Sequence, residues 1–206
     1  KVKDKKNEFL VIWTTTPWTI PFNLGVMANP TMDYVKAKVE DEVWILSKEL
    51  TNDVMKKAGK KFKVLEEFKG KELENMKYEH PMNDMLKDHY KHLSKKAKKL
   101  HVVAMCEEYV TADSGTGLVH MAPGCGAEDY EIGHREGIPP FNEVKEDGYY
   151  DNTMGKLSGL HVKEDTQKFI EAIEETGALV AKEDYPHDYG HCWRCRNPIL
   201  YRTTTQ

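Results

Sequence analysis

The sequence predicts an α+β fold with a mixed, largely antiparallel, barrel-like β core and flanking helices. Two observations lead to this fold class. The predicted strands outnumber the predicted helices, and several strands follow one another with no helix between them. A chain of 206 residues is also long enough for one large domain with a substantial core.

The first half of the chain is expected to consist mainly of strands. Residues 7–16 (NEFLVIWTTT) are predicted to form a strand that Pro17 ends. Residues 33–46 alternate apolar and polar positions on both sides of Glu40 and Asp41, which predicts a hairpin with its turn at these two acids.

A short helix is predicted at residues 47–60, with Ser47 as its N-cap and Gly59 just after its end. Residues 61–68 are a candidate strand. Residues 78–92 are polar and are expected to be irregular.

The second half is expected to mix strands with helices. Two of the helices carry end signals, because a glycine follows each of them. In order, the expected elements are strands at 101–110 and 118–122, a short helix at 127–137, an amphipathic helix at 161–177, and strands at 178–185 and 199–205.

Composition points to a soluble globular protein. Hydrophobic residues make up 39% of the chain and charged residues 31%, and no apolar stretch is long enough to cross a membrane. The formal net charge is −4, so the strongly basic surface of a nucleic-acid-binding domain is not expected. The one dense basic run, residues 95–99, fits a solvated helix face at least as well as a phosphate contact.

The stretch WTTTPWT, residues 13–19, places four threonines around the end of the first predicted strand. Threonine is favoured in strands, so ordinary strand packing explains the run by composition alone. Strand alternation would direct Thr14 and Thr16 to one face and Thr15 to the other. Beyond the proline, the chain is expected to turn off the sheet.

A second motif, GTGLVHMAPGCGAEDYEIG at residues 115–133, joins a glycine turn, a strand carrying His120 and a helix with Asp129 in its first turn. Acids in a first turn complement the helix dipole, and a lone histidine is usually structural. The dipole would also lower the pKa of Asp129, so that its carboxylate stays ionised and suits a ligand ammonium. Cys125 lies near the helix N-terminus without an orienting group, which disfavours a nucleophilic role.

The four cysteines are unevenly spaced and do not suggest a disulfide framework. Cys192 and Cys195, in HCWRC, form a Cys-x-x-Cys pair, which is half of a tetrahedral zinc site. His187 or His191 would serve as a further ligand, but a second Cys-x-x-Cys pair is missing from the sequence. The pair therefore indicates metal more strongly than it indicates a site closed within this chain.

Together these motifs resemble the editing domain of the isoleucyl-tRNA synthetases, a large connective-peptide insertion in the class I catalytic core. WTTTPWT resembles the threonine-rich motif of that family, and GTGLVHMAPGCGAEDY resembles its second editing motif. GHCWRCRNPILYRTTTQ resembles the return segment towards the catalytic core, so the resemblance covers nearly the whole chain. The related valyl and leucyl enzymes carry Thr-Arg-Pro where this chain has Thr15-Thr16-Pro17, which favours the isoleucyl family.

The resemblance implies hydrolysis of the ester that joins valine to the terminal adenosine of the isoleucine tRNA, and also editing of valyl-adenylate. One methylene group in an apolar pocket is worth only about 1–3 kcal/mol, a limit for which the isoleucyl enzymes are the standard example, so a synthetic site for isoleucine cannot strongly reject valine. A second, smaller pocket that excludes isoleucine would remove the valyl product.

The resemblance also implies roles for individual residues. Asp129 would bind the substrate α-ammonium, and Thr14, Thr15 and Thr16 are with it the candidate catalytic residues. The hydroxyls near the adenosine, the ester and the attacking water would be those of Thr14, Thr15, Thr16 and Thr19. The side chains bordering the pocket for the amino acid would be Trp18, His120 and Tyr189. No general base is identified; a ribose hydroxyl is expected to help position the water, and threonines and backbone N–H groups to support the oxyanion.

The resemblance therefore divides the chain into an editing domain at residues 1–186 and a return segment at residues 187–206. Editing needs no cofactor, and Cys192 and Cys195 would bind structural zinc in the full enzyme with ligands from outside this chain. The expected partners are the valine-bearing acceptor end of the isoleucine tRNA and the catalytic core of the same polypeptide. We expect a cytoplasmic monomer with no membrane contact.

Two alternatives stay open from the sequence. The first is the editing domain of a valyl or leucyl enzyme, for which hydrolysis of threonyl-tRNA in preference to valyl-tRNA would favour the valyl family. The second is a non-catalytic RNA-binding or zinc-stabilised structural module. That module would need a basic face and a closed metal site, and both the net charge and the single Cys-x-x-Cys pair disfavour it.

Overall fold

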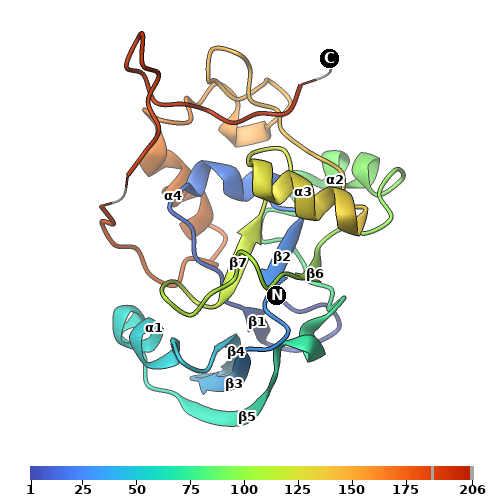
Figure 1. The fold of residues 1–206 in the computed structure, drawn as a ribbon, viewed down its shortest axis with the longest axis vertical. Helices are drawn as coiled ribbons and strands as arrows, with labels where there is room; N and C mark the ends of the chain where they lie inside the picture. The colour runs from blue at the N-terminus through green and yellow to red at the C-terminus, as the bar shows by residue number, and fades with distance from the viewer. Residues whose placement is uncertain (187, 205–206) are drawn as a thin grey trace.

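Two β-sheets pack against each other, and helices cover their outer faces (Figure 1). The structure is a computed structural model that describes residues 1–186 and 188–204. Within these residues the strands form one four-stranded and one three-stranded sheet, each with parallel and antiparallel pairs. The predicted mixed α+β class is therefore confirmed, but the described strands form two separate sheets and not a closed barrel.

The four-stranded sheet has the order β1-β4-β3-β5. Its strands are β1 (Glu8–Leu10), β3 (Asp33–Val39), β4 (Glu42–Ser47) and β5 (Lys63–Lys69). β3 and β4 form the predicted hairpin, with Glu40 at φ 52° in its turn. β1 pairs with β4 in parallel and ends at Leu10, so the predicted first strand is shorter than expected and does not include the threonine run.

The three-stranded sheet has the order β6-β2-β7. Its strands are β2 (Gly25–Ala28), β6 (Val102–Met105) and β7 (Leu118–Met121). β2 lies at the centre, parallel to β6 and antiparallel to β7, with Val26 opposite His120. β6 and β7 were predicted from the sequence, whereas β2 was not.

Strand alternation gives each sheet two apolar faces. In β2, Val26 and Ala28 belong to the layer between the sheets, and Met27 faces the opposite way. The layer between the sheets contains buried residues from both of them: Val26, Ala28, Tyr34, Ile45, Val103 and Leu118.

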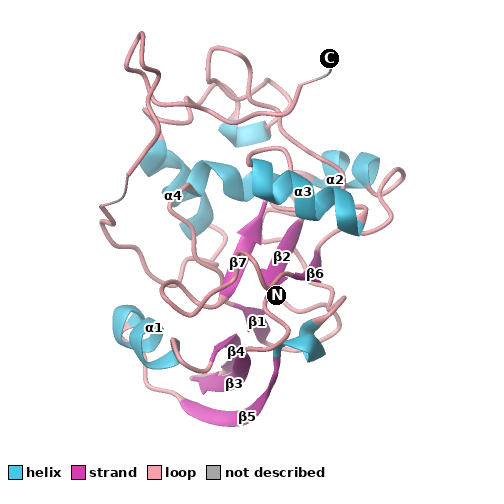
Figure 2. Ribbon diagram, viewed as in Figure 1, coloured by secondary structure: helices cyan, strands magenta, loops and turns pink. Residues whose placement is uncertain are grey.

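Helices cover the two outer faces (Figure 2). Helix α1 (Thr51–Ala58) packs Val54 and Met55 on the four-stranded sheet. Three helices pack on the three-stranded sheet: α2 (Lys87–Leu93), α3 (Ala127–Glu136) and α4 (Thr166–Glu174). The glycines predicted to follow α1 and α3 do so in left-handed conformation, as Gly59 and Gly137.

Several local expectations were wrong. Ser47 is not an N-cap, because it ends β4 and α1 begins only at Thr51. Residues 78–92 are not wholly irregular, since α2 begins within them and packs Tyr90 into the core. The predicted strands at 178–185 and 199–205 are absent from their described residues, which have no neighbouring strand to pair with.

A buried 3-10 helix, η1 (Pro17–Phe22), connects β1 to β2 and contains two prolines. Its carbonyl groups receive hydrogen bonds from side chains far away in the sequence. His80 Nε2 donates to the carbonyl of Ile20 at 3.0 Å, and the Tyr90 hydroxyl donates to that of Pro21 at 3.0 Å. The Tyr150 hydroxyl donates to the Trp18 carbonyl. These three donors fix a segment that cannot complete its own helical bonds.

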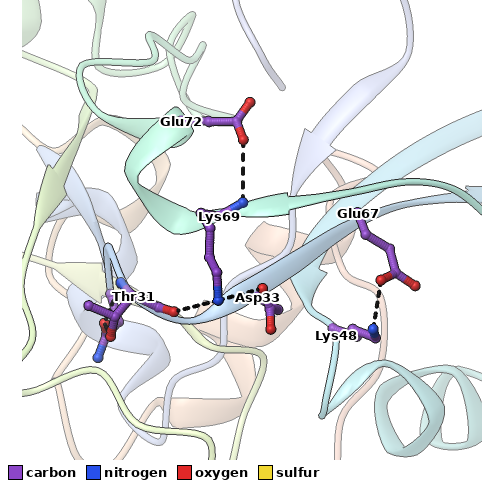
Figure 3. A network of polar contacts seen from close by, with 7 residues as sticks. Thr31, Asp33, Lys48, Glu67, Lys69 and Glu72 are labelled. Atoms are coloured by element: carbon purple, nitrogen blue, oxygen red, sulfur yellow. Dashed lines mark hydrogen bonds and ion pairs between the residues drawn. The ribbon is translucent and has the colours of Figure 1, made fainter.

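The edge of the four-stranded sheet is polar (Figure 3). Lys69, at the end of β5, contacts Asp33 at 2.8 Å and the Thr31 carbonyl at 3.1 Å, and Lys48 contacts Glu67 at 2.6 Å. Exposed ion pairs of this kind contribute only about 0–1 kcal/mol each. Their charges protect an otherwise open strand edge from pairing with another chain.

The core should lose stability in mild acid. Burial lowers the pKa of His80 to about 3 and that of His101 to about 4. Below the unfolded pKa of about 6.5 the unfolded chain binds protons that the folded chain does not, so the free energy of unfolding falls as the pH drops from 6.5 towards 4. Each histidine contributes at most about 1.4 kcal/mol per pH unit. Urea unfolding at several pH values measures the slope, which His101→Phe should reduce; an equal slope in that variant contradicts the assignment.

Candidate functional site

The threonine run lies beside β7 because the chain crosses from one sheet to the other after β1. Val11 N–H still bonds to the carbonyl of Ile45 in β4, at 3.1 Å. Two residues later, Trp13 forms a parallel bridge with Val119 of β7. The crossing brings the threonines next to His120, which follows Val119.

Three threonines form a hydrogen-bonded row that we call the threonine ladder: Thr14, Thr16 and Thr19. Thr14 Oγ1 lies 3.2 Å from Thr16 Oγ1, and Thr16 Oγ1 lies 3.2 Å from Thr19 Oγ1. Thr14 Oγ1 also accepts the Thr16 N–H at 3.0 Å. Thr15 is exposed and takes no part in this row. The predicted shared side of Thr14 and Thr16 is confirmed, although a local turn and not a strand creates it.

The loop before β7 approaches Ser47, at the end of β4, so closely that it needs a glycine at position 117. Gly117 has a φ of 73°, and a Cβ atom there would lie 2.4 Å from the Cβ of Ser47. Its carbonyl accepts a hydrogen bond from the buried Tyr34 hydroxyl at 2.7 Å. The predicted glycine turn is confirmed, and it seats the start of β7 on the four-stranded sheet.

His120 is buried at the end of the threonine ladder. Its Nε2 lies 2.9 Å from Thr19 Oγ1, and its Nδ1 lies 2.8 Å from Asn23 Nδ2. The amide of Asn23 also contacts the Gly25 carbonyl at 2.8 Å and the Tyr78 hydroxyl. Burial lowers the pKa of His120 to about 4, so the ring is neutral near pH 7. Sequence reasoning missed Asn23 and Tyr78; the position of Asn23 just after the threonine motif was the available signal.

Asp129 stands in the first turn of α3, as predicted, but its pKa is shifted in the opposite direction. Burial is the largest effect and raises the pKa to about 6, against a backbone hydrogen bond from Ala122 N–H to Oδ2 at 2.9 Å that lowers it. The predicted lowering by the helix dipole was therefore wrong, because desolvation outweighs it. The carboxylate is still mostly ionised at pH 7 and stands in a poorly solvated place.

Two cavities meet at the threonines. The first, of 350 Å³, is lined by His120 and Asp129 and by part of the glycine turn, and we call it the Asp129 cavity. The second, of 320 Å³, is lined by Trp18 and Tyr189, and we call it the Trp18 cavity. The residues that line both are Thr15, Thr16, Thr19 and Cys125.

The structure thus separates residues that the sequence grouped together. Trp18 and His120 were expected to border one pocket, yet they line different cavities on the two sides of the threonines. Tyr189 lies with Trp18, as a wall of the Trp18 cavity. The predicted catalytic threonines and Asp129 do come together, since all of them line the Asp129 cavity.

Lys163 adds a cation beside the Trp18 cavity. Its Nζ lies 3.5 Å from the ring centroid of Tyr189 and 5.7 Å from that of Trp18. Burial lowers its pKa to about 8. The Lys163 ammonium is attracted to the electron-rich faces of these two rings.

Cys125 is not an activated nucleophile in this arrangement. Burial, and the nearby Asp129 carboxylate, raise the pKa of its thiol above the usual range. A protonated thiol is a poor nucleophile, which agrees with the sequence-based interpretation.

Cys192 and Cys195 lie in the last described segment. The backbone N–H groups of Cys195 and Arg194 point at the Cys192 sulfur and lower its pKa, which favours the thiolate that binds zinc. Residues 1–186 and 188–204 contain no group of three or more His, Cys, Asp or Glu side chains placed to hold a metal ion. His191 therefore does not complete a site there, and His187 lies outside the described residues.

Comparison with known proteins identifies the family. Over its whole length the chain is 46% identical to the isoleucine–tRNA ligase of Pyrococcus abyssi, across 212 aligned residues that are 19% of that protein. It is likewise 43% identical to the isoleucine–tRNA ligase of Aquifex aeolicus, covering 21% of it, and 42% identical to that of Archaeoglobus fulgidus, covering 20%. The chain belongs, as a segment, to the isoleucine–tRNA ligase family. It spans about a fifth of the length of these relatives, and no protein-family model matches it.

The fold also has a counterpart among solved structures. The crystal structure described as GlLeuRS-CP1 superposes with a TM-score of 0.65 over 88% of this chain and 87% of that one. Its sequence identity is 18%, so this likeness concerns the fold alone. The likeness agrees with the predicted mixed α+β fold. None of the helices in the described part of the segment has the length and apolar character of a membrane span.

Replacing Asp129 by Asn should stabilise this isoleucine–tRNA ligase segment. The folded pKa of about 6 lies above the unfolded value of 3.8, so ionisation opposes folding, and this cost grows as the pH rises from 4 to above 6. Asp129→Asn removes the cost and keeps an oxygen for Ala122 N–H. With allowance for solvent screening, we expect a gain of about 1–2 kcal/mol at pH 7. Urea unfolding at pH 5 and pH 8 measures it; an unchanged or lower stability at pH 8 contradicts the raised pKa.

Proposed function

We propose that this segment is the hydrolytic editing domain of an isoleucine–tRNA ligase and that it deacylates isoleucine tRNA mischarged with valine. One observation carries the proposal: the desolvated carboxylate of Asp129 and the four threonines of residues 13–19 line one cavity, and three of these threonines also line a second cavity with aromatic walls. The family relationship supplies the substrate class, an amino acid esterified to the end of a tRNA.

The Asp129 cavity suits the amino acid. A substrate α-ammonium would donate a charge-assisted hydrogen bond to the Asp129 carboxylate. Because little water surrounds this carboxylate, the bond would be stronger than the same bond in water. The neighbouring wall contains His120, whose two ring nitrogens are already occupied by Thr19 and Asn23. His120 therefore limits the size of the cavity and is not free to accept a proton from water.

The Trp18 cavity suits the terminal nucleoside. Trp18 and Tyr189 supply aromatic faces on which a base stacks, and base–aromatic stacking is worth about 1–3 kcal/mol. With the amino acid on one side and the nucleoside on the other, the ester lies at the threonines that both cavities share. This placement assigns Thr15 and Thr16 to the ester, with Thr14 on the amino acid side.

Water activation then depends on position and not on a strong base. Threonine hydroxyls do not ionise near neutral pH, Asp129 is engaged by the ammonium, and the nitrogens of His120 are occupied. We assign orientation of the water to the threonine hydroxyls and to a neighbouring ribose hydroxyl of the substrate. Hydroxyl and backbone N–H donors at the same wall would stabilise the oxyanion.

The wider assignment follows from the same proposal. The partners are the acceptor end of the tRNA and the remaining part of the ligase polypeptide, which acts as a cytoplasmic monomer. The segment needs no cofactor for editing. Cys192 and Cys195 would supply two thiolates to a structural zinc ion, and its other ligands would come from outside the described residues. Residues 1–186 would form the editing domain, and 187–206 the return segment.

Asp129→Ala should lower deacylation of valyl-tRNA(Ile) by at least about 100-fold, because the substrate ammonium loses its partner. Glu128→Gln is the matched control: Glu128 is the neighbouring acid on α3, it is exposed, and its removal should leave activity within about twofold. The measurement is release of labelled valine from the tRNA. Equal losses in both variants would exclude a specific role for Asp129.

Activity should also depend on the ionisation of Asp129. With a pKa of about 6, the carboxylate becomes protonated as the pH falls below 6, and kcat/KM for the valyl ester should fall tenfold per pH unit there. Glu128→Gln should keep the shape of this profile and move its midpoint to slightly lower pH, because the Glu128 charge contributes to the raised pKa of Asp129. A profile that is flat from pH 5 to pH 7 would contradict ammonium binding by an ionised Asp129.

Substrate preference separates the candidate functions. An isoleucyl editing domain should hydrolyse valyl-tRNA(Ile) faster than isoleucyl-tRNA(Ile) and faster than threonyl-tRNA. A preference for the threonyl ester would instead indicate a valyl-type specificity. Tight RNA binding with no hydrolysis of any ester, tested also with the intact ligase, would indicate a structural module.

A further inference from the structure

The threonine ladder continues into a buried chain of polar groups whose hydrogen-bond directions can be assigned. The chain begins at the amide of Asn23, which is buried. A backbone carbonyl only accepts, so the Asn23 atom at 2.8 Å from the Gly25 carbonyl is the amide nitrogen. The amide oxygen then accepts the hydroxyl proton of Tyr78. The second amide hydrogen of Asn23 is directed at His120 Nδ1, 2.8 Å away.

This donor decides which nitrogen of His120 carries the proton. Since Nδ1 accepts from Asn23, the single proton of the neutral ring is on Nε2. Nε2 therefore donates to Thr19 Oγ1 at 2.9 Å. The hydroxyl proton of Thr19 is directed to the Thr16 carbonyl at 2.8 Å, which leaves Thr19 Oγ1 as an acceptor on its ladder side.

The direction propagates along the ladder. Thr16 Oγ1 donates to Thr19 Oγ1, and Thr14 Oγ1 donates to Thr16 Oγ1, each across 3.2 Å. One lone pair of Thr14 Oγ1 accepts the Thr16 N–H at 3.0 Å. The remaining lone pair of Thr14 has no assigned donor, and Thr14 lines the Asp129 cavity. With His120 as the other tautomer, Nε2 would accept the Thr19 proton, and the bond from Thr19 to the Thr16 carbonyl would be lost.

We propose that Tyr78, acting through Asn23, is a positioning residue that fixes the Nε2–H tautomer of His120, which leaves the Thr19 hydroxyl proton for the Thr16 carbonyl and so holds the threonine ladder in place beside the Asp129 cavity. Thr14 then presents a hydrogen-bond acceptor to that cavity. An acceptor holds the hydrogen of an attacking water, whereas an oxyanion needs a donor. Oxyanion stabilisation is thereby left to Thr15 and to backbone N–H groups. The role in water positioning rests on the proposed function; the tautomer does not.

Burial agrees with this arrangement. His120, Asn23 and Tyr78 are 7%, 3% and 8% exposed, so water does not compete for the bonds between them. The same burial holds the pKa of His120 at about 4, and the ring stays neutral over the pH range in which an ionised Asp129 is present.

The tautomer is measurable without any activity assay. In a 15N-labelled chain at pH 7, His120 should show a protonated Nε2 and an unprotonated Nδ1 in long-range 1H–15N spectra. Tyr78→Phe keeps the ring but loses the bond to Asn23, and the share of the Nδ1–H tautomer should rise about fivefold, the effect of one lost hydrogen bond. Tyr34→Phe is the matched control, because Tyr34 is buried in the same layer and its hydroxyl bonds to the Gly117 carbonyl; the His120 signals should not change.

Either of two results overturns the proposal: an Nδ1–H tautomer in the unaltered chain, or a Tyr78→Phe spectrum with the same tautomer ratio. The first needs no variant and is decisive even if Tyr78→Phe does not fold. A kinetic arm tests the water role in the intact ligase. Tyr78→Phe should lower kcat for valyl-tRNA(Ile) with KM unchanged, and Thr14→Ser should retain activity that Thr14→Val loses. If the unaltered ligase hydrolyses no ester, the proposed function fails, while the spectra still decide the tautomer.

Discussion

The candidate site depends on how the carbonyl groups of η1 are satisfied. This segment is buried, contains two prolines and cannot complete a regular helical ladder. An unsatisfied buried carbonyl costs about 1–3 kcal/mol, and three side chains from distant parts of the chain remove that cost: His80, Tyr90 and Tyr150. Because η1 carries Trp18 and Thr19, the same bonds fix the wall between the two cavities. The geometry of the site is therefore a property of the whole core and not of the threonine motif alone.

Sequence reasoning succeeded where the deciding contacts are local. The β3–β4 hairpin, the ends of α1 and α3 and the common side of Thr14 and Thr16 all follow from spacings of a few residues. It failed where distant contacts decide. β2 contains only four residues and is a strand because β6 and β7 flank it, and α2 is stabilised by packing Tyr90 under η1. The link from Tyr78 to Asn23 joins residues 55 positions apart, which no local pattern reveals.

Asp129 shows how two opposite effects compete at one residue. The N-terminus of α3 and the Ala122 N–H both favour its ionised form, while burial disfavours it and is the stronger effect. A carboxylate kept in such a place lowers the stability of the free domain. The same poor solvation strengthens its attraction for a cation, so stability is exchanged for binding strength at this position.

The end of the described chain returns to the site. Thr203 N–H bonds to the carbonyl of Gly124 at 3.1 Å, and Ile199 N–H bonds to that of Gly190 at 2.9 Å. The loop with Cys192 and Cys195 lies between Tyr189 and the bond at Ile199, so one short segment carries both cysteines and a wall of the Trp18 cavity. A displacement of the cysteine loop would therefore also move Tyr189 and the wall of the Trp18 cavity to which it belongs. Any group that binds both cysteines would thus also fix the position of this wall.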